Sequence, residues 1–304
     1  MKIYLSKINE SWIVDRVRKE WYKFNPSIST NSIMRADIVW IISPWIWKKI
    51  PLRHLCSKKV VCSYYHFDFE KFGKDQLDNF NELDQYVNEY HVISEKTKTQ
   101  LETLTDKKIT SIPFWVNQNI WFEIEEKIFL RETLGFTKKD FLVGSFQRDT
   151  EGKDLISPKL VKGPDIFLDI TSKIYKKNKN LKVVLTGKRR NYLINNFEKN
   201  GIPYAYFEMA NFDKINQLYN VLDLYIVSSR IEGGPQAILE AGITKTPIIS
   251  TDVGVASEIL HKDSIYSDDY TTAIPMIDHA YRNAKKYSIP AGFEDFITLF
   301  KKIK

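Results

Sequence analysis

The chain has 304 residues, 43% hydrophobic and 27% charged, which excludes extended disorder and is enough for two globular domains. Its net charge of +7 permits an anionic ligand, but the lysines are scattered, which is typical of a solvated basic surface and predicts no specific nucleic-acid partner. Two cysteines, Cys56 and Cys62, exclude a disulfide framework and a cysteine-based metal site.

The first part of the chain alternates short apolar runs with amphipathic segments. The pattern predicts strands at 2–6, 36–43, 58–67, 89–94 and 108–114, and helices at 10–24, 46–56, 75–86 and 95–104. The longest apolar run, 38–47, is broken by Ser43 and Pro44 and is about half the ~20 residues that span a bilayer. Because the N-terminus also lacks a signal-peptide pattern, we expect a cytoplasmic location.

The same alternation restarts near residue 140. Strands are predicted at 141–146, 181–187, 204–209, 224–229 and 247–251, and helices at 163–178, 190–201, 212–222, 235–243 and 255–261. Continuous apolar strands joined by helices predict parallel sheets with both faces covered. We therefore expect two Rossmann-like, doubly wound α/β domains, 1–138 and 139–290, with an amphipathic helix at 291–304 packing back on the first.

The stretch RIEGGPQAILEAG, residues 230–242, holds two glutamates with seven residues between them. Glu232 precedes Gly233 and Gly234, whose lack of side chains lets a ligand approach the backbone, and a helix start offers N–H groups suited to phosphate. Glu240 would lie roughly 7–8 Å further along the helix, which matches the separation of a diphosphate from its ribose. On spacing alone, a helix-surface acid and an N-terminal dipole partner explain the glutamates equally well.

The surrounding residues closely resemble the signature region of glycosyltransferase family 4, which has the glycosyltransferase-B fold of two domains facing across a cleft. The resemblance rests on the two glutamates, on Thr246-Pro247 and Asp252-Val253-Gly254, and upstream on FLVGSFQR and Lys162-Gly163. It implies a retaining enzyme that moves a sugar from a nucleotide-diphosphate donor to a glycan or lipid-linked acceptor. The family's glycine-rich loop after the first strand is replaced here by LSKINES, residues 5–11.

The resemblance also implies roles for single residues. Arg148 and Lys162 would bind the donor diphosphate, Glu240 the ribose, and Glu232 with the amides of Gly233 and Gly234 the sugar. Two cations stabilise the charge that develops on the leaving group, so no metal ion or other cofactor is expected. His66, at the end of the strand at 58–67, matches the histidine that faces the donor sugar, although without the resemblance a capping or core histidine is the better interpretation.

A second stretch, SPWIWKKIPLRH, places two tryptophans beside lysines. Trp45, Trp47, Lys48 and Lys49 could make peripheral contact with an anionic membrane, or the tryptophans could stack on a sugar acceptor. Ordinary core packing is an equally good explanation, because tryptophan is usually buried. Two rivals to the transferase remain open: a non-catalytic nucleotide-sugar or glycan-binding protein of the same fold, and a nucleotide-sugar epimerase.

Overall fold

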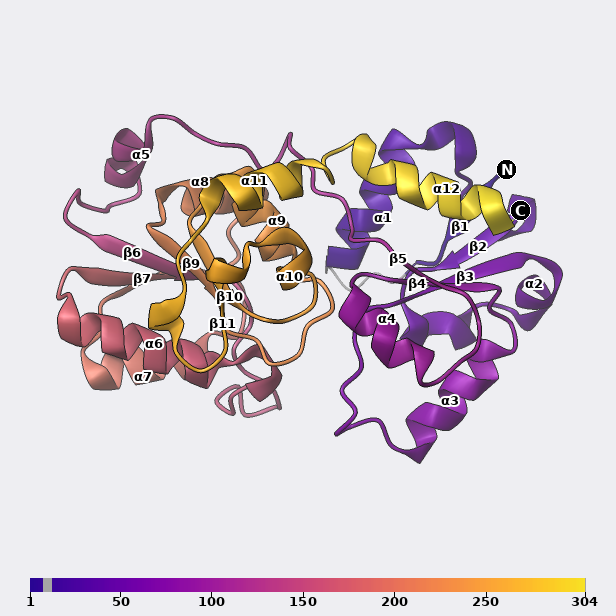
Figure 1. The fold of residues 1–304 in the computed structure, drawn as a ribbon, viewed down its shortest axis with the longest axis horizontal. Coiled ribbons are helices and arrows are strands. Elements are labelled where there is room, and N and C mark those ends of the chain that lie inside the picture. Colours follow the sequence, from indigo (N-terminus) through magenta and orange to yellow (C-terminus); the bar gives the residue numbers. More distant parts are fainter. Residues whose placement is uncertain (8–12, 304) are drawn as a thin grey trace. The chain divides into compact units, whose positions relative to one another are not determined.

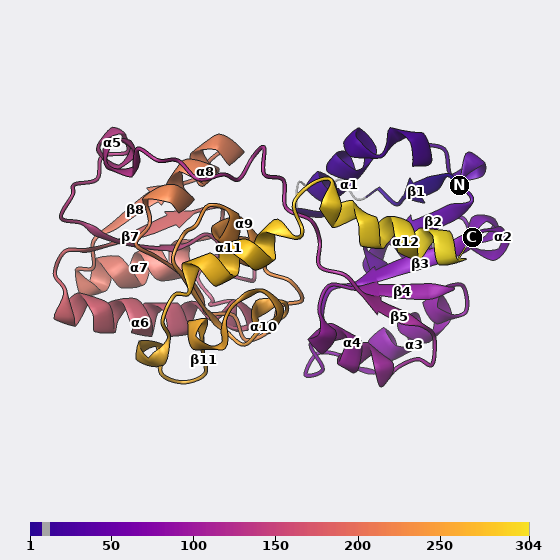
Figure 2. The ribbon, with the colours of Figure 1, turned by 45° about the horizontal axis from the view of Figure 1, so that its top comes forward.

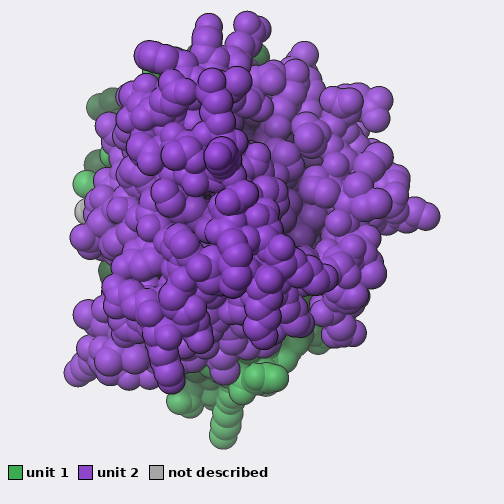
Figure 3. Space-filling view, turned by 90° about the vertical axis from the view of Figure 1, so that its left-hand side faces the viewer, with its two compact units in different colours: residues 1–115, 290–304 green, residues 116–289 purple. Residues whose placement is uncertain are grey.

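The computed structural model describes residues 1–7 and 13–303, and they form two compact units (Figure 1). Unit 1 comprises residues 1–115 and 290–304, and unit 2 comprises residues 116–289; Figure 3 colours them separately. Most of the glycine-free segment 5–11 lies outside the described residues, so its comparison with the family's loop stays a sequence observation.

Unit 1 contains a parallel sheet whose five strands follow chain order, β1-β2-β3-β4-β5. The strands are β1 (Ile3–Leu5), β2 (Ile38–Ile41), β3 (Lys59–Tyr64), β4 (Glu89–Val92) and β5 (Ile109–Ser111). The helices are α1 (Ile13–Phe24), α2 (Leu52–Ser57), α3 (Lys74–Asp84), α4 (Glu95–Glu102) and α12 (Glu294–Ile303).

Neighbouring residues of one strand face opposite sides of this sheet, and both sides are covered. Val39 and Ile41 of β2 belong to a core cluster that also contains Phe80 and Leu83 of α3. Trp40 faces the other way, and its ring lies 5.2 Å from the rings of Phe296 and Phe300. The final helix therefore packs in unit 1 and covers one face of the sheet, as Figure 2 shows.

Unit 2 contains a six-stranded parallel sheet with the order β11-β10-β9-β6-β7-β8. The strands are β6 (Phe141–Ser145), β7 (Leu181–Thr186), β8 (Tyr204–Phe207), β9 (Leu224–Val227), β10 (Ile248–Thr251) and β11 (Ile265–Tyr266). The helices are α5 (Lys127–Thr133), α6 (Pro164–Lys177), α7 (Asn191–Asn200), α8 (Phe212–Val221), α9 (Gln236–Ile243), α10 (Ala256–Ile259) and α11 (Ile277–Lys285). Alternating strands and helices produce the predicted α/β class in both units.

The division between the units differs from the sequence expectation of 138/139, because residues 116–138 belong to unit 2. Asn216 and Asn220 of α8 accept hydrogen bonds from the backbone N–H groups of Phe122 and Ile124, at 3.1 and 2.7 Å. Arg131 donates to the carbonyl of Val221. In sequence, residues 116–138 have the charged composition of a linker. The side-chain contacts attach this segment to α8, and the periodicity of the sequence does not reveal such contacts.

Prolines account for two further differences at helix ends. The helix predicted at 46–56 is a 3₁₀ turn over Pro44–Lys49 followed by α2, because Pro51 forces the preceding Ile50 into an extended conformation (ψ 125°). The helix predicted from Pro235 begins at Gln236, with Pro235 itself at ψ 108°. The sequence pattern also did not predict strand β11 or helices α5 and α11.

Candidate functional site

The predicted ligand-binding residues of unit 2 gather where the sheet order reverses. The chain moves outward from β6 to β7 and β8, then returns to place β9 on the other side of β6, with Gly144 opposite Tyr225. At such a switch point the loops after two neighbouring strands diverge and leave a crevice at their carboxyl ends. Arg148 follows β6, and Glu232 follows β9.

A turn before α6 brings Lys162 to the same place. Gly163 has φ of +60°, and a Cβ atom there would lie 1.7 Å from the carbonyl oxygen of Ser228. Only glycine permits both the left-handed conformation and this approach to the end of β9. The Lys-Gly pair therefore has a structural reason, since glycine allows the lysine's backbone to lie against the neighbouring strand's end.

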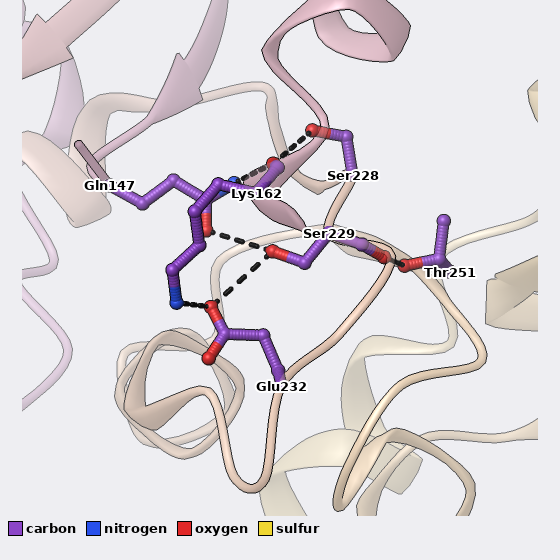
Figure 4. Close-up of polar contacts among 6 residues, drawn as sticks. All are labelled: Gln147, Lys162, Ser228, Ser229, Glu232 and Thr251. Atoms are coloured by element: carbon purple, nitrogen blue, oxygen red, sulfur yellow. Dashed lines mark hydrogen bonds and ion pairs between the residues drawn. The ribbon is translucent and has the colours of Figure 1, made fainter. Parts of the chain in front are cut away.

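Lys162 and Glu232 form a direct ion pair, which Figure 4 shows together with its neighbours. The Ser229 hydroxyl donates to Glu232 Oε1 at 3.3 Å and lies 3.1 Å from Gln147 Oε1. Gln147 in turn donates from Nε2 to the carbonyl of Lys162 at 2.8 Å. Thr251 of β10 donates to the carbonyl of Ser229 at 2.6 Å, so three strand ends hold the pair in place.

Glu240 lies inside α9 and is 8% exposed, so the structure does not place it as a surface acid. The Tyr219 hydroxyl of α8 donates to Glu240 Oε2 at 3.0 Å. Burial, then Tyr225 and Glu240 itself, raise the pKa of Tyr219, which keeps the phenol protonated and able to donate. Gly233 is buried and Gly234 is partly exposed in the loop leading to α9.

Arg148 is exposed at the rim of this site, and its side chain forms no hydrogen bond or ion pair within residues 1–7 and 13–303. The next residue, Asp149, is buried and pairs with buried Arg190, with Oδ2 and Nε 3.4 Å apart. Burial raises the pKa of Asp149 to about 6, against the opposing effects of Arg190 and of the N–H groups of Leu193 and Tyr192. The pair ties the loop after β6 to the start of α7.

His66 lies in unit 1, two residues after the end of β3, and is exposed. The buried histidine of unit 1 is His91, whose Nε2 is 2.8 Å from the carbonyl of Ile112 and whose pKa burial lowers to about 4. Exposure rules out the core-histidine interpretation of His66, and its predicted role toward a sugar stays a prediction.

The tryptophan stretch is split between surface and core. Trp47 is 1% exposed and donates to Asn79 at 3.2 Å, so the expected membrane contact through it is wrong: it packs in the core of unit 1. Trp45 is 47% exposed. Lys48 pairs with Glu82 at 2.7 Å, and Lys49 is exposed. In the part of the chain that the structure describes, no helix is long and apolar enough to cross a membrane.

The sequence reasoning missed the residues that position the predicted ones. Gln147, Ser229 and Tyr219 hold Lys162, Glu232 and Glu240, and Asp149 with Arg190 anchors the loop of Arg148. Their only sequence signal is their place beside the motifs, which does not reveal a contact. Among the described residues, no group of three or more His, Cys, Asp or Glu could hold a metal ion.

The part of unit 2 that contains most of these residues resembles a known protein family. Residues 155–274 match the family model described as Glycosyl transferases group 1, and this match contains Lys162, Glu232 and Glu240. The match lies within unit 2. None of the curated protein sequences compared matches the chain.

Solved structures show the same fold over nearly the whole chain. HepE from Anabaena, in complex with UDP-glucose, has a TM-score of 0.76 and 14% identity over 99% of both chains. Sucrose-phosphate synthase from Thermosynechococcus elongatus has a TM-score of 0.72 and 12% identity, over 98% of this chain and 80% of that one. The pneumococcal O-GlcNAc transferase GtfA, in complex with UDP and GlcNAc, has a TM-score of 0.66 and 13% identity, over 96% of this chain and 59% of that one. The expected glycosyltransferase-B fold is confirmed.

Proposed function

We propose that this protein transfers a sugar from a nucleotide-diphosphate donor to an acceptor hydroxyl, with retention and without a metal ion, as in glycosyltransferase family 4. The observation that carries the proposal is the Lys162–Glu232 ion pair at the switch point of a glycosyltransferase group 1 domain, beside Arg148. UDP is the nucleotide we propose first, because the similar structures named above include complexes with UDP and UDP-glucose.

The proposed roles follow from charge and position. Arg148 and Lys162 bind the diphosphate and stabilise its charge as the glycosidic bond breaks, with arginine suited to bidentate contact. Glu232 accepts hydrogen bonds from sugar hydroxyls, and the amides of Gly233 and Gly234 bind beside it. The acceptor attacks from the same face, assisted by the leaving phosphate, so no side chain serves as a covalent nucleophile. His66 holds a hydroxyl of the donor sugar, as the resemblance implies.

The acceptor is proposed to be a glycan or a lipid-linked sugar. Exposed Trp45, with Lys49 nearby in the chain, is the part of the tryptophan stretch that could still meet such a molecule or a membrane surface. Replacing Trp45 by alanine should therefore impair transfer to the acceptor more than hydrolysis of the donor.

The test is turnover of UDP-sugars with and without chelator. We expect release of UDP from one member of a panel of UDP-sugars, at a rate that EDTA leaves unchanged, because two cations take the place of a metal. Loss of release in EDTA that Mg²⁺ or Mn²⁺ restores would overturn metal independence. UDP binding without any turnover would favour the non-catalytic binding protein, and interconversion of donor sugars without acceptor would favour the epimerase.

Glu240 and Tyr219 give a second prediction, on nucleotide binding. Glu240→Gln should weaken UDP binding by about 1–3 kcal/mol, because an amide oxygen accepts more weakly from the ribose diol than a carboxylate. Tyr219→Phe should weaken it less, since only the donor that orients Glu240 is lost. Calorimetric titration with UDP measures both, and Tyr204→Phe, which removes an exposed phenol bonded to Glu198, is the matched control. An unchanged affinity in Glu240→Gln would contradict the ribose role.

A further inference from the structure

The loop between β6 and α6 carries a lysine, Lys159, outside the motifs discussed above. Its backbone N–H donates to the carbonyl of Asp149 at 2.8 Å, and its carbonyl accepts from the N–H of Lys162 at 2.8 Å. Thr150 and Pro158 form an antiparallel bridge that closes the loop. The backbone of Lys159 is therefore bonded to the residue that follows Arg148 and to Lys162, one turn further along the chain.

The buried pair beneath the loop makes this placement rigid. The N–H groups of Asp149 and Thr150 both donate to the carbonyl of Arg189, at 3.1 and 3.3 Å, and the side chain of Asp149 pairs with Arg190. Because Asp149 directly follows Arg148 and its carbonyl accepts the Lys159 N–H, the same anchor sets the positions of Arg148 and Lys159.

The charges around Lys159 are unbalanced. Burial, then Arg148 and Lys162, lower the pKa of Lys159, while Glu232 and Glu151 act in the opposite direction. Glu232 is already paired directly with Lys162. Within the described ranges 1–7 and 13–303, the Lys159 ammonium has no hydrogen bond or ion pair. A partly buried cation that is repelled by two others is costly to fold, which is expected where an anion binds.

We propose that Lys159 is a third phosphate-binding cation, which contacts the donor's diphosphate together with Arg148 and Lys162. The inference deepens the proposed function and rests on it for the class of donor. Two linked phosphates offer more oxygen atoms to three cations than a single phosphate does. Lys159 therefore increases the preference of the site for a diphosphate over a monophosphate.

The test uses inorganic pyrophosphate, which needs no assumption about base or sugar. Calorimetric titrations at fixed ionic strength compare the wild type with Lys159→Met, Lys159→Arg and Lys153→Met. Lys153 is exposed in the same loop, so its variant removes an equal charge away from the site. We expect Lys159→Met to weaken binding by about 10- to 100-fold, the effect of one hydrogen bond between charged groups. Lys159→Arg should stay close to the wild type, and so should Lys153→Met.

The inference would be overturned if the wild type did not bind pyrophosphate, or if Lys159→Met bound it with unchanged affinity. Equal losses of affinity in Lys159→Met and Lys153→Met would also overturn it, because they would indicate a general electrostatic effect of positive charge on the loop. Inorganic phosphate should bind the wild type and Lys159→Met with similar weakness. If Lys159→Met fails to fold, Lys159→Gln decides, because it keeps a polar side chain without charge and should lose affinity like the methionine variant.

UDP-glucose turnover separates this inference from the proposed function. If pyrophosphate binding needs Lys159 but no UDP-sugar is turned over, the proposed activity fails and the cation site stands. If UDP-sugars are turned over and Lys159→Met matches the wild type toward pyrophosphate and UDP, the activity stands and Lys159 has no part in it.

Discussion

Replacing Arg148 or Lys162 by alanine should lower the turnover number for a UDP-sugar by about 30- to 1,000-fold, which corresponds to roughly 2–4 kcal/mol of transition-state stabilisation. Negative charge on the diphosphate increases as the bond to the sugar breaks, so each cation binds the transition state more strongly than the ground state. Steady-state kinetics of UDP release measure the effect, with UDP affinity determined separately.

The two variants should differ in one respect. Lys162→Ala also releases Glu232 from its ion pair, so a freed carboxylate then faces the diphosphate, and UDP affinity should fall further than in Arg148→Ala. Lys153→Ala, at an exposed position of the same loop, is the control for loss of charge alone. Loss of UDP affinity with an unchanged turnover number in both variants would indicate uniform binding and contradict a role in the transition state.

The second large effect concerns stability. Asp149→Asn should lower the free energy of unfolding of unit 2 by about 3–5 kcal/mol, because it leaves the guanidinium of Arg190 buried without a charged partner. The nitrogens of Arg190 already lack hydrogen-bond partners among the described residues, so no other group compensates. The double variant Asp149→Leu/Arg190→Met should lose much less, because an apolar pair of similar volume needs no desolvation of charge. Urea denaturation followed by circular dichroism measures both variants against the wild type.

The pH dependence of the partner variant has a definite sign. Arg190→Met leaves a buried carboxyl whose pKa, already raised to about 6, rises further without the arginine. A carboxyl with a raised folded-state pKa binds its proton more tightly when folded, so its penalty is absent at low pH and appears as pH rises through the folded pKa. Arg190→Met should therefore be less destabilised at pH 5 than at pH 8. A loss that is the same at both pH values would contradict the buried-pair account.

Local patterns in the sequence are enough to predict the α/β class and to select the residues of the proposed phosphate site. Apolar strands and amphipathic helices have periods of two and 3.6 residues, which depend on backbone geometry and not on distant contacts. The Lys-Gly turn and the two glutamates lie in short motifs beside strand ends, where parallel sheets bind ligands. The resemblance to a family of known fold contributed the assignment of roles, which spacing alone left open.

Contacts between segments far apart in the chain were decided only by the tertiary structure. The asparagines of α8 attach residues 122 and 124 to unit 2, although the segment has the composition of a linker. Trp45 and Trp47 look alike in sequence but differ in burial, because only Trp47 reaches the core beside α3. Tyr219 and Glu240 are 21 positions apart, and no local rule pairs a phenol with a carboxylate at that distance. The sequence by itself therefore determined the helices and strands and the charged motifs. Packing within each unit decided which side chains orient those motifs, because hydrogen bonds and burial depend on neighbours that the chain brings together only by folding.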